Sequence, residues 1–156
     1  IVTSFTSFSN KSLTNLKAWS IVGGFAEDFF IDYVDNDYCM KLRNNGYKII
    51  RNHETNIYHE LGKSEVYYFF GFKIKYSKHK PFRLYYMTRN NMYLIKKYKK
   101  NMNVIKEYTK MAYELLMGCI FSDEKAETVK YIIKGFADYK NNIKGKLVEW
   151  KIIIYM

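Results

Sequence analysis

The sequence predicts an α/β chain whose first half holds a few short strands and whose second half is mainly helical. Two observations lead to this prediction. Residues 1–80 contain most of the eight glycines, all three histidines and the short runs in which apolar and polar residues alternate. Residues 81–156 show instead the three- and four-residue apolar spacing of amphipathic helices. The change falls at Pro81, so we divide the chain into these two segments.

In the first segment, apolar spacing predicts a helix over 11–22, which Gly23 would end, and a second helix over 34–44, which ends before Gly46. The aromatic run 65–76 is compatible with a strand or a loop. The alternation of apolar and polar residues predicts three short strands, over 1–8, 47–50 and 56–59.

The second segment predicts three helices, over 82–100, 103–119 and 123–137. Pro81 suits the first position of the first helix, and Ser122 is a favourable cap for the third. The apolar stripe of each helix is interpreted as core. The tail 144–156 is compatible with a strand or a last helical turn.

Composition excludes some classes without naming a function. The chain has 156 residues, a net charge of +11, 48% hydrophobic residues and 19% aromatic residues. It is too apolar for disorder and has no uncharged stretch long enough to span a membrane. Cys39 and Cys119 are far apart in sequence, so we expect reduced thiols and no disulfide framework. A basic chain with many aromatic rings is suited to binding polyanions or sugars. A gene rich in A/T codons would encode the same composition, so composition alone identifies no ligand.

Five acids gather within eleven residues of this basic chain, which favours a site where a cation, a proton or a polar substrate relieves their repulsion. The dipole of the helix predicted over 34–44 would help to keep acids at its start ionised. The alternative is that they cap this helix and pair with Lys41 and Arg43. The acids are Glu27, Asp28, Asp32, Asp35 and Asp37.

Three motifs in order resemble one known family. They are Gly23-Gly24-Phe25 with FFIDYVDNDYCMKLR at 29–43, IYHELG at 57–62, and HKPFRLYYMTRN at 79–90. Together they are similar to the second half of family 2 glycosyltransferases of the GT-A fold, a Rossmann-like α/β fold, and most of all to rhamnosyltransferase-like members. The resemblance covers residues 20–91. It differs at Thr3-Ser4-Phe5, where the family usually has Thr-Ser-Gly.

The resemblance implies inverting transfer of a sugar, with rhamnose as one candidate, from a nucleotide-diphosphate donor. The acceptor would be a glycan or a lipid-linked glycan in bacterial cell-surface polysaccharide synthesis. By the same resemblance, Asp35 is the catalytic base and His59 helps to hold a divalent cation, Mg or Mn. Acceptor binding is assigned to Asp37, Asp32 and Glu27. Diphosphate binding is assigned to Arg83, Tyr86, Arg89 and His79.

The resemblance also implies that the donor-binding half of the enzyme precedes Ile1. We therefore expect a truncated domain over 1–80, a helical segment over 81–156, and little activity of the isolated chain. A cytoplasmic location at the inner face of the membrane follows, with peripheral contact through the lysines of the later helices. An apolar face left by the missing half would favour a homodimer.

Two other classes of protein fit part of the sequence. A basic, aromatic nucleic-acid-binding module fits the charge, but the acidic cluster would repel phosphates, so we expect no nucleic-acid partner. A helical interaction module without catalysis fits the second segment but leaves the ordered motifs unexplained.

Overall fold

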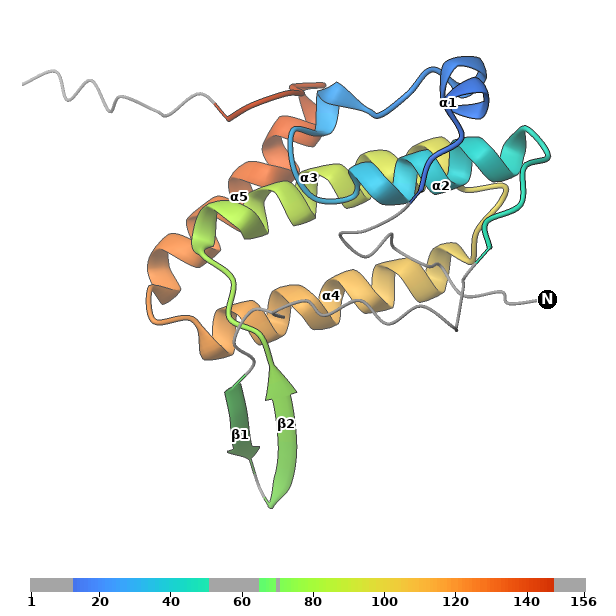
Figure 1. Cartoon of the computed structure of the whole chain (residues 1–156). Helices are drawn as coiled ribbons and strands as arrows, with labels where there is room; N and C mark the ends of the chain where they lie inside the picture. The colour runs from blue at the N-terminus through green and yellow to red at the C-terminus, as the bar shows by residue number, and fades with distance from the viewer. Residues whose placement is uncertain (1–12, 51–64, 70, 148–156) are drawn as a thin grey trace, which may run out of the picture.

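The computed structural model describes residues 13–50, 65–69 and 71–147. In these ranges it consists of five α-helices, one 3₁₀ turn and one hairpin (Figure 1). In chain order they are α1 (Leu16–Val22), η1 (Glu27–Phe29), α2 (Val34–Asn44), β1 (Glu65–Phe69), β2 (Phe72–Tyr76), α3 (Pro81–Tyr98), α4 (Val104–Phe121) and α5 (Lys125–Lys140).

Helix α3 is the centre of the described structure. It packs most extensively against α5 and also contacts α4 and α2 (Figure 1). Leu84, Leu94 and Ile95 are almost completely buried along it. Phe29, Met40 and the residues of α3 around Leu94 share one hydrophobic cluster, so the segments before and after Pro81 are joined by a common core.

Local signals explain where the helices begin. Pro81 occupies the start of α3, where its missing N–H is not needed. The side chain of Asn103 accepts a hydrogen bond from the Lys106 backbone at the start of α4, and Asn15 caps α1 in the same way. Gly23 ends α1 in the left-handed region that glycine adopts without strain. These ends confirm the predicted helices of 34–44, 82–100, 103–119 and 123–137 to within a few residues.

The aromatic run 65–76 forms a β-hairpin. β1 and β2 pair antiparallel, with Glu65 opposite Tyr76, and Gly71 adopts a positive φ in the turn. The Tyr67 ring stacks on Phe121 at the end of α4, with 4.1 Å between ring centroids. The strand interpretation is therefore confirmed, and the hairpin is anchored on α4.

Two predictions in the first segment need correction. Residues 47–50 form no strand, although they are described. Tyr47 and Ile49 instead pack against the cluster of Ala18, Tyr38 and Leu42, so their alternation serves packing against helices. Within the helix predicted over 11–22, α1 begins at Leu16 and residues 13–15 are not helical, while 11 and 12 lie outside the described residues. The predicted strands over 1–8 and 56–59, and most of the tail from 148, lie outside the described residues.

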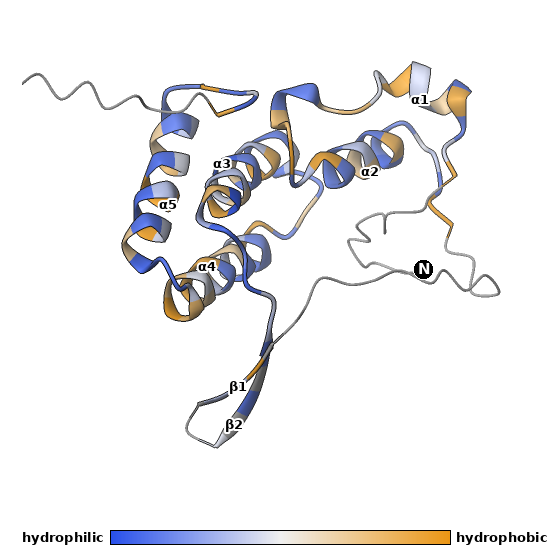
Figure 2. Ribbon diagram, turned by 60° about the vertical axis from the view of Figure 1, so that its left-hand side comes forward, coloured by the Kyte–Doolittle hydropathy of each residue, from blue (hydrophilic) through white to orange (hydrophobic). Residues whose placement is uncertain are grey.

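The buried faces of α4 and α5 agree with the prediction only in part. Met111 and Ile132, from the predicted stripes, are buried. Ile105, Leu116 and Ile133 belong to the predicted core stripes, but their exposed fractions are 79%, 56% and 62%. In α5 the buried residues are Thr128, Ile132, Gly135 and Asp138, and at Gly135 the close approach of α3 leaves no room for a Cβ. Hydrophobic residues recur along most of α4 (Figure 2). None of the described helices is both long and apolar enough to span a bilayer.

Candidate active site

The acidic segment leaves η1 and enters α2 through an unusual backbone. Phe30, Asp32 and Tyr33 have φ angles of 65°, 57° and 63°, in the left-handed region that residues other than glycine rarely adopt. Each such residue costs about 1–3 kcal/mol and persists only when its surroundings hold it. The segment therefore needs an external restraint, and α3 supplies it.

Asn90 of α3 holds this backbone through its side-chain amide. Its Nδ2 donates hydrogen bonds to the carbonyl oxygens of Phe29 (2.9 Å), Ile31 (2.7 Å) and Asp32 (3.2 Å). The neighbouring Arg89 donates to the same Phe29 oxygen at 3.4 Å, and both side chains are completely buried. We call Arg89 and Asn90 the loop clamp. It fixes the residues that lead into Asp35.

Arg89 is itself held in place by α3 and α5. Its guanidinium donates a hydrogen bond to the Tyr85 hydroxyl (2.9 Å), which in turn donates to the Asp138 carboxylate (2.7 Å). Burial and the neighbouring Asp138 carboxylate raise the pKa of Tyr85. Lys134 forms an ion pair with Asp138 at 3.0 Å. The clamp is thus the end of a buried polar network that crosses the α3–α5 interface.

Asp35 lies in the first turn of α2 and is half-buried. Burial raises its pKa, the opposite of the direction that we expected for an acid at the start of a helix. Within the described ranges its carboxylate has neither a hydrogen bond nor an ion pair. A desolvated carboxylate of this kind is more basic than an ordinary one.

Asp37, two positions further along the same turn of α2, is completely buried and paired. Lys97 and Lys41 contact its carboxylate at 2.6 Å and 3.1 Å, and the Tyr98 hydroxyl donates a hydrogen bond at 2.9 Å. Burial alone would raise the pKa of Asp37, but these donors outweigh it and lower the pKa. The alternative that acids pair with Lys41 is confirmed for Asp37.

The third acid, Asp32, lies near two residues that were predicted to bind diphosphate, Arg83 and His79. Arg83 donates to its carboxylate from Nε (3.2 Å) and from the guanidinium terminus (2.9 Å). The Arg83 side chain is half-exposed. His79, just before α3, has a lowered pKa because of burial and the Arg83 charge, which Asp32 partly opposes. Asp32, Arg83 and His79 therefore form one polar group, in which the Arg83 side chain is accessible and the Asp32 side chain is only 14% exposed.

The other predicted site residues lie elsewhere. Tyr86 and Arg89 are buried, and the Tyr86 hydroxyl accepts a hydrogen bond from the Leu147 backbone at 2.7 Å. Both therefore contact protein groups, and their diphosphate role stays a prediction. Glu27 is exposed in η1. His59 lies outside the described residues.

The sequence analysis did not single out Asn90 or the polar contacts of Tyr33. The Tyr33 hydroxyl lies 3.5 Å from the Glu114 carboxylate and accepts a hydrogen bond from Asn91 at 3.0 Å. Burial and the charges of Glu114 and Glu107 raise the pKa of Tyr33. The only available signal was the Arg-Asn pair inside the third motif, which carries no information about a partner in the acidic segment.

The expected divalent cation has no complete ligand set in the described part of the chain. No three side chains of histidine, cysteine, aspartate or glutamate there are placed to hold a metal ion. Asp37 is already occupied by two lysines. The metal expectation stays a prediction, and no step proposed below depends on it.

Comparison with known proteins gives one relative. No protein-family model matches the chain, and no solved structure is similar to it. The chain is 31% identical over 94 residues, or 60% of its length, to the dTDP-rhamnosyl transferase RfbF of Shigella flexneri. The match spans about a third (31%) of that protein's length. This similarity relates part of the chain to a glycosyltransferase.

Proposed function

We propose that this chain is the acceptor-side part of an inverting glycosyltransferase in which Asp35 is the general base. The observation that carries the proposal is the contrast among three neighbouring acids. Asp32 is paired with Arg83 and Asp37 with two lysines, whereas Asp35 is half-buried, has a raised pKa and pairs with no cation among the described residues. A general base works best when its pKa approaches the working pH, so Asp35 is the acid suited to accept a proton.

The step itself is a single displacement. The Asp35 carboxylate removes the proton of an acceptor hydroxyl while that oxygen forms a bond to the anomeric carbon of the donor sugar. The bond from the anomeric carbon to the diphosphate oxygen breaks, and the diphosphate leaves with the electron pair. Attack opposite the leaving group inverts the configuration at the anomeric carbon.

We propose that the group of Asp32, Arg83 and His79 supplies positive charge for the leaving diphosphate. Arg83 offers guanidinium donors at a half-exposed position, so it is the predicted diphosphate ligand that is most able to reach phosphate oxygens. We propose that Asp32 orients Arg83 through their ion pair. His79, with its lowered pKa, is mainly neutral at neutral pH and serves as a hydrogen-bonding neighbour.

The loop clamp gives Arg89 and Asn90 a positioning role. They act through the Phe29, Ile31 and Asp32 carbonyls and do not touch the reacting atoms. We propose that this restraint sets the direction of Asp35, because α2 begins two residues after Asp32. A misplacement of about 1 Å at such a base costs about 100-fold in rate.

The donor is proposed from the relative. RfbF is named a dTDP-rhamnosyl transferase, so a dTDP-linked deoxysugar is the first donor to test. A glycan or lipid-linked hydroxyl is the proposed acceptor.

The test is transfer by the gene product that contains this chain, measured with dTDP-rhamnose and a membrane or glycan extract as acceptor source. Asp35→Asn should lower turnover by about 100- to 10,000-fold, the usual contribution of a general base, and leave donor binding unchanged. Asp123→Asn is the matched control, because Asp123 is exposed and pairs only with Lys78 among the described residues. Near-normal turnover by Asp35→Asn would show that the base is another group.

A further inference from the structure

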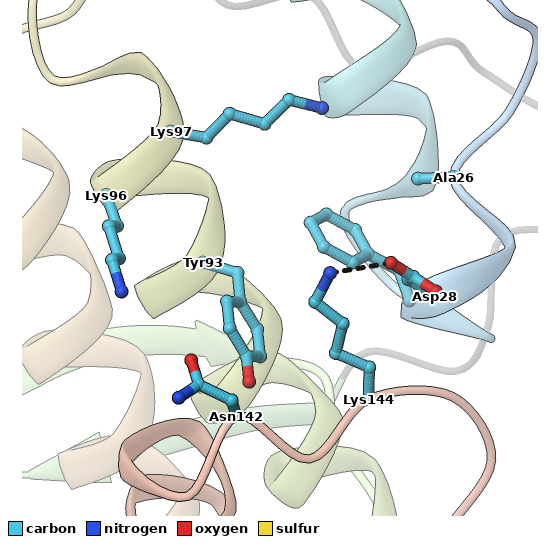
Figure 3. A pocket seen from close by; sticks show the side chains of 8 residues that line it. Ala26, Asp28, Tyr93, Lys96, Lys97, Asn142 and Lys144 are labelled. Carbon is cyan, nitrogen blue, oxygen red and sulfur yellow. Dashed lines mark hydrogen bonds and ion pairs between the residues drawn. The ribbon is translucent and has the colours of Figure 1, made fainter.

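The described part of the chain also forms a pocket beside η1. It is an open pocket of about 510 Å³ between η1, the last turns of α3 and the loop that follows α5 (Figure 3). Neither Asp35 nor the group of Asp32, Arg83 and His79 lines it. The residues that define its chemistry are Asp28, Tyr93, Lys96, Lys97, Asn142 and Lys144.

Positive charge dominates the pocket. Three ammonium groups line it against the single carboxylate of Asp28. Lys97 reaches away toward α2, where it pairs with Asp37 (Figure 3). Lys96 has no ion pair with any residue that the structure describes, and its ammonium lies 5.8 Å from the centre of the Tyr139 ring. Lys96 is therefore available to an external anion.

The ion pair of Lys144 does not remove its charge from the pocket. Its Nζ lies 2.7 Å from the Asp28 carboxylate, but the side chains are 47% and 60% exposed. Exposed pairs of this kind are screened by water and are weak, so an incoming anion can share the Lys144 ammonium. Asn142, with a positive φ of 57°, adds a side-chain amide that has no hydrogen bond in the described part of the chain.

These features select a small phosphate group. Lysine ammonium groups are compact point charges with three donors each, so those of Lys96 and Lys144 can approach the oxygens of a tetrahedral anion from different directions. The Tyr93 ring forms one wall and holds the loop after α5 by donating a hydrogen bond to the Ile143 carbonyl. The volume suits a small ligand.

We propose that this pocket binds phosphate oxygens through Lys96, Lys144 and the Asn142 amide. The phosphate comes either from a soluble diphosphate or from the headgroup of an anionic lipid. Such a ligand ties the loop after α5 to α3 and so stabilises the folded chain. The site is independent of the proposed transferase step, and its test measures no sugar transfer.

The test uses the full chain and two phosphate sources at constant ionic strength. Inorganic pyrophosphate is titrated by calorimetry and by thermal unfolding, and vesicles of phosphatidylcholine with and without phosphatidylglycerol are tested by co-sedimentation. The variant is Lys96→Gln with Lys144→Gln. The control is Lys125→Gln with Lys130→Gln, which changes the net charge equally at two exposed positions of α5.

Pyrophosphate should raise the midpoint of thermal unfolding, and the Lys96/Lys144 variant should bind it at least about tenfold more weakly than the control does. Selective binding to phosphatidylglycerol vesicles that only this variant loses would assign the lipid headgroup as the source. The proposal is overturned if neither source binds, or if both double variants lose affinity equally, since the effect then comes from net charge alone.

Discussion

Asp35 and Asp37 lie two residues apart in the first turn of α2, and the protein shifts their pKa values in opposite directions. Asp35 is half-buried without a cation, so its pKa rises. Asp37 is buried deeper, but Lys97, Tyr98 and Lys41 surround it, so its pKa falls. The Asp35 carboxylate is thus more basic than usual, whereas the Asp37 carboxylate stays ionised to lower pH. The first suits proton transfer, and the second joins α2 to the end of α3.

Asp35→Asn should stabilise the protein at neutral pH. A raised folded pKa means that the native state binds its proton more tightly than the unfolded state does. The wild type therefore loses stability as pH rises above 3.8, the ordinary aspartate value, and the loss is complete above the folded pKa. Asparagine does not titrate, so the variant lacks this loss. Urea unfolding across this pH range measures the difference.

The stabilising effect of Asp35→Asn should disappear below the ordinary aspartate pKa, because Asp35 is then protonated in both the folded and the unfolded wild-type protein. Asp123→Asn is the control, with a change of free energy of unfolding within about 0.5 kcal/mol at each pH. A less stable Asp35→Asn at neutral pH would mean that the carboxylate has a stabilising partner.

Asp37→Asn should have the opposite effect. The substitution leaves the ammonium groups of Lys97 and Lys41 without this carboxylate, and because Lys97 is 48% exposed to water, the expected loss of stability at neutral pH is about 1–3 kcal/mol. Because the folded pKa of Asp37 is lowered, its contribution is full above the unfolded pKa and is lost as pH falls through the folded value. The difference between Asp37→Asn and wild type should therefore shrink in acid. A pH-independent difference would assign the effect to packing.

Asn90→Ala tests the loop clamp. It removes the donor for the Phe29, Ile31 and Asp32 carbonyls and releases a backbone with three positive φ angles. We expect a loss of about 1–2 kcal/mol in the free energy of unfolding, because the Ile31 and Asp32 carbonyls lose their amide donor, whereas the Phe29 carbonyl keeps the Ile31 N–H and Arg89. Hydrogen exchange of the amides of residues 29–33 should accelerate more than that of α5.

The exposed Asn101 provides the control for this experiment, because its replacement by alanine removes no described side-chain hydrogen bond. Equal acceleration throughout the protein in Asn90→Ala would indicate global destabilisation and would contradict a local clamp. If the proposed transferase function holds, Asn90→Ala should lower kcat more than it raises KM, because Asn90 is proposed to position Asp35.

Helix positions could be predicted from the sequence because their signals are local. Pro81 and Asn103 mark the starts of α3 and α4, and periodicity supplies their lengths. The loop clamp could not be predicted in the same way. Asn90 binds carbonyl oxygens about 60 residues away, and a carbonyl has no side-chain signature. Burial of Arg89 is equally a tertiary property, so a motif that suggests a surface phosphate ligand is also compatible with an internal support.

The faces of the helices were harder to predict than their positions. Hydrophobicity favoured Val129 and Ile133 as the core of α5, yet both are exposed. The face that packs on α3 contains Thr128, Gly135 and Asp138, because a close approach and a polar network decide the contact there. Hydrophobic periodicity reports neither how closely two helices approach nor which polar side chains form a buried network.

Gly135→Ala should destabilise the protein by disturbing the α3–α5 contact. A Cβ at this position would lie 2.7 Å from the Tyr85 carbonyl oxygen and 2.9 Å from the Thr88 Cβ. The Tyr85 carbonyl belongs to the backbone and cannot rotate away as a side chain could. Helices α3 and α5 must therefore separate, at a cost of about 1–3 kcal/mol. The higher helix propensity of alanine returns up to about 1 kcal/mol. The net loss should therefore be about 1 kcal/mol or more in urea unfolding.

Gly118→Ala is the matched comparison, since it also adds one methyl group to a buried helical glycine. Its Cβ would lie 2.8 Å from Leu84 Cδ1, the end of a flexible side chain that can change rotamer. Gly118→Ala should thus be tolerated better than Gly135→Ala. Because Tyr85 carries the hydrogen bond from Arg89, separating α3 from α5 should also loosen the loop clamp. Faster amide exchange at residues 29–33 in Gly135→Ala, and not in Gly118→Ala, would connect this interface to the acidic segment; equal exchange in both variants would show that the network ends at Arg89.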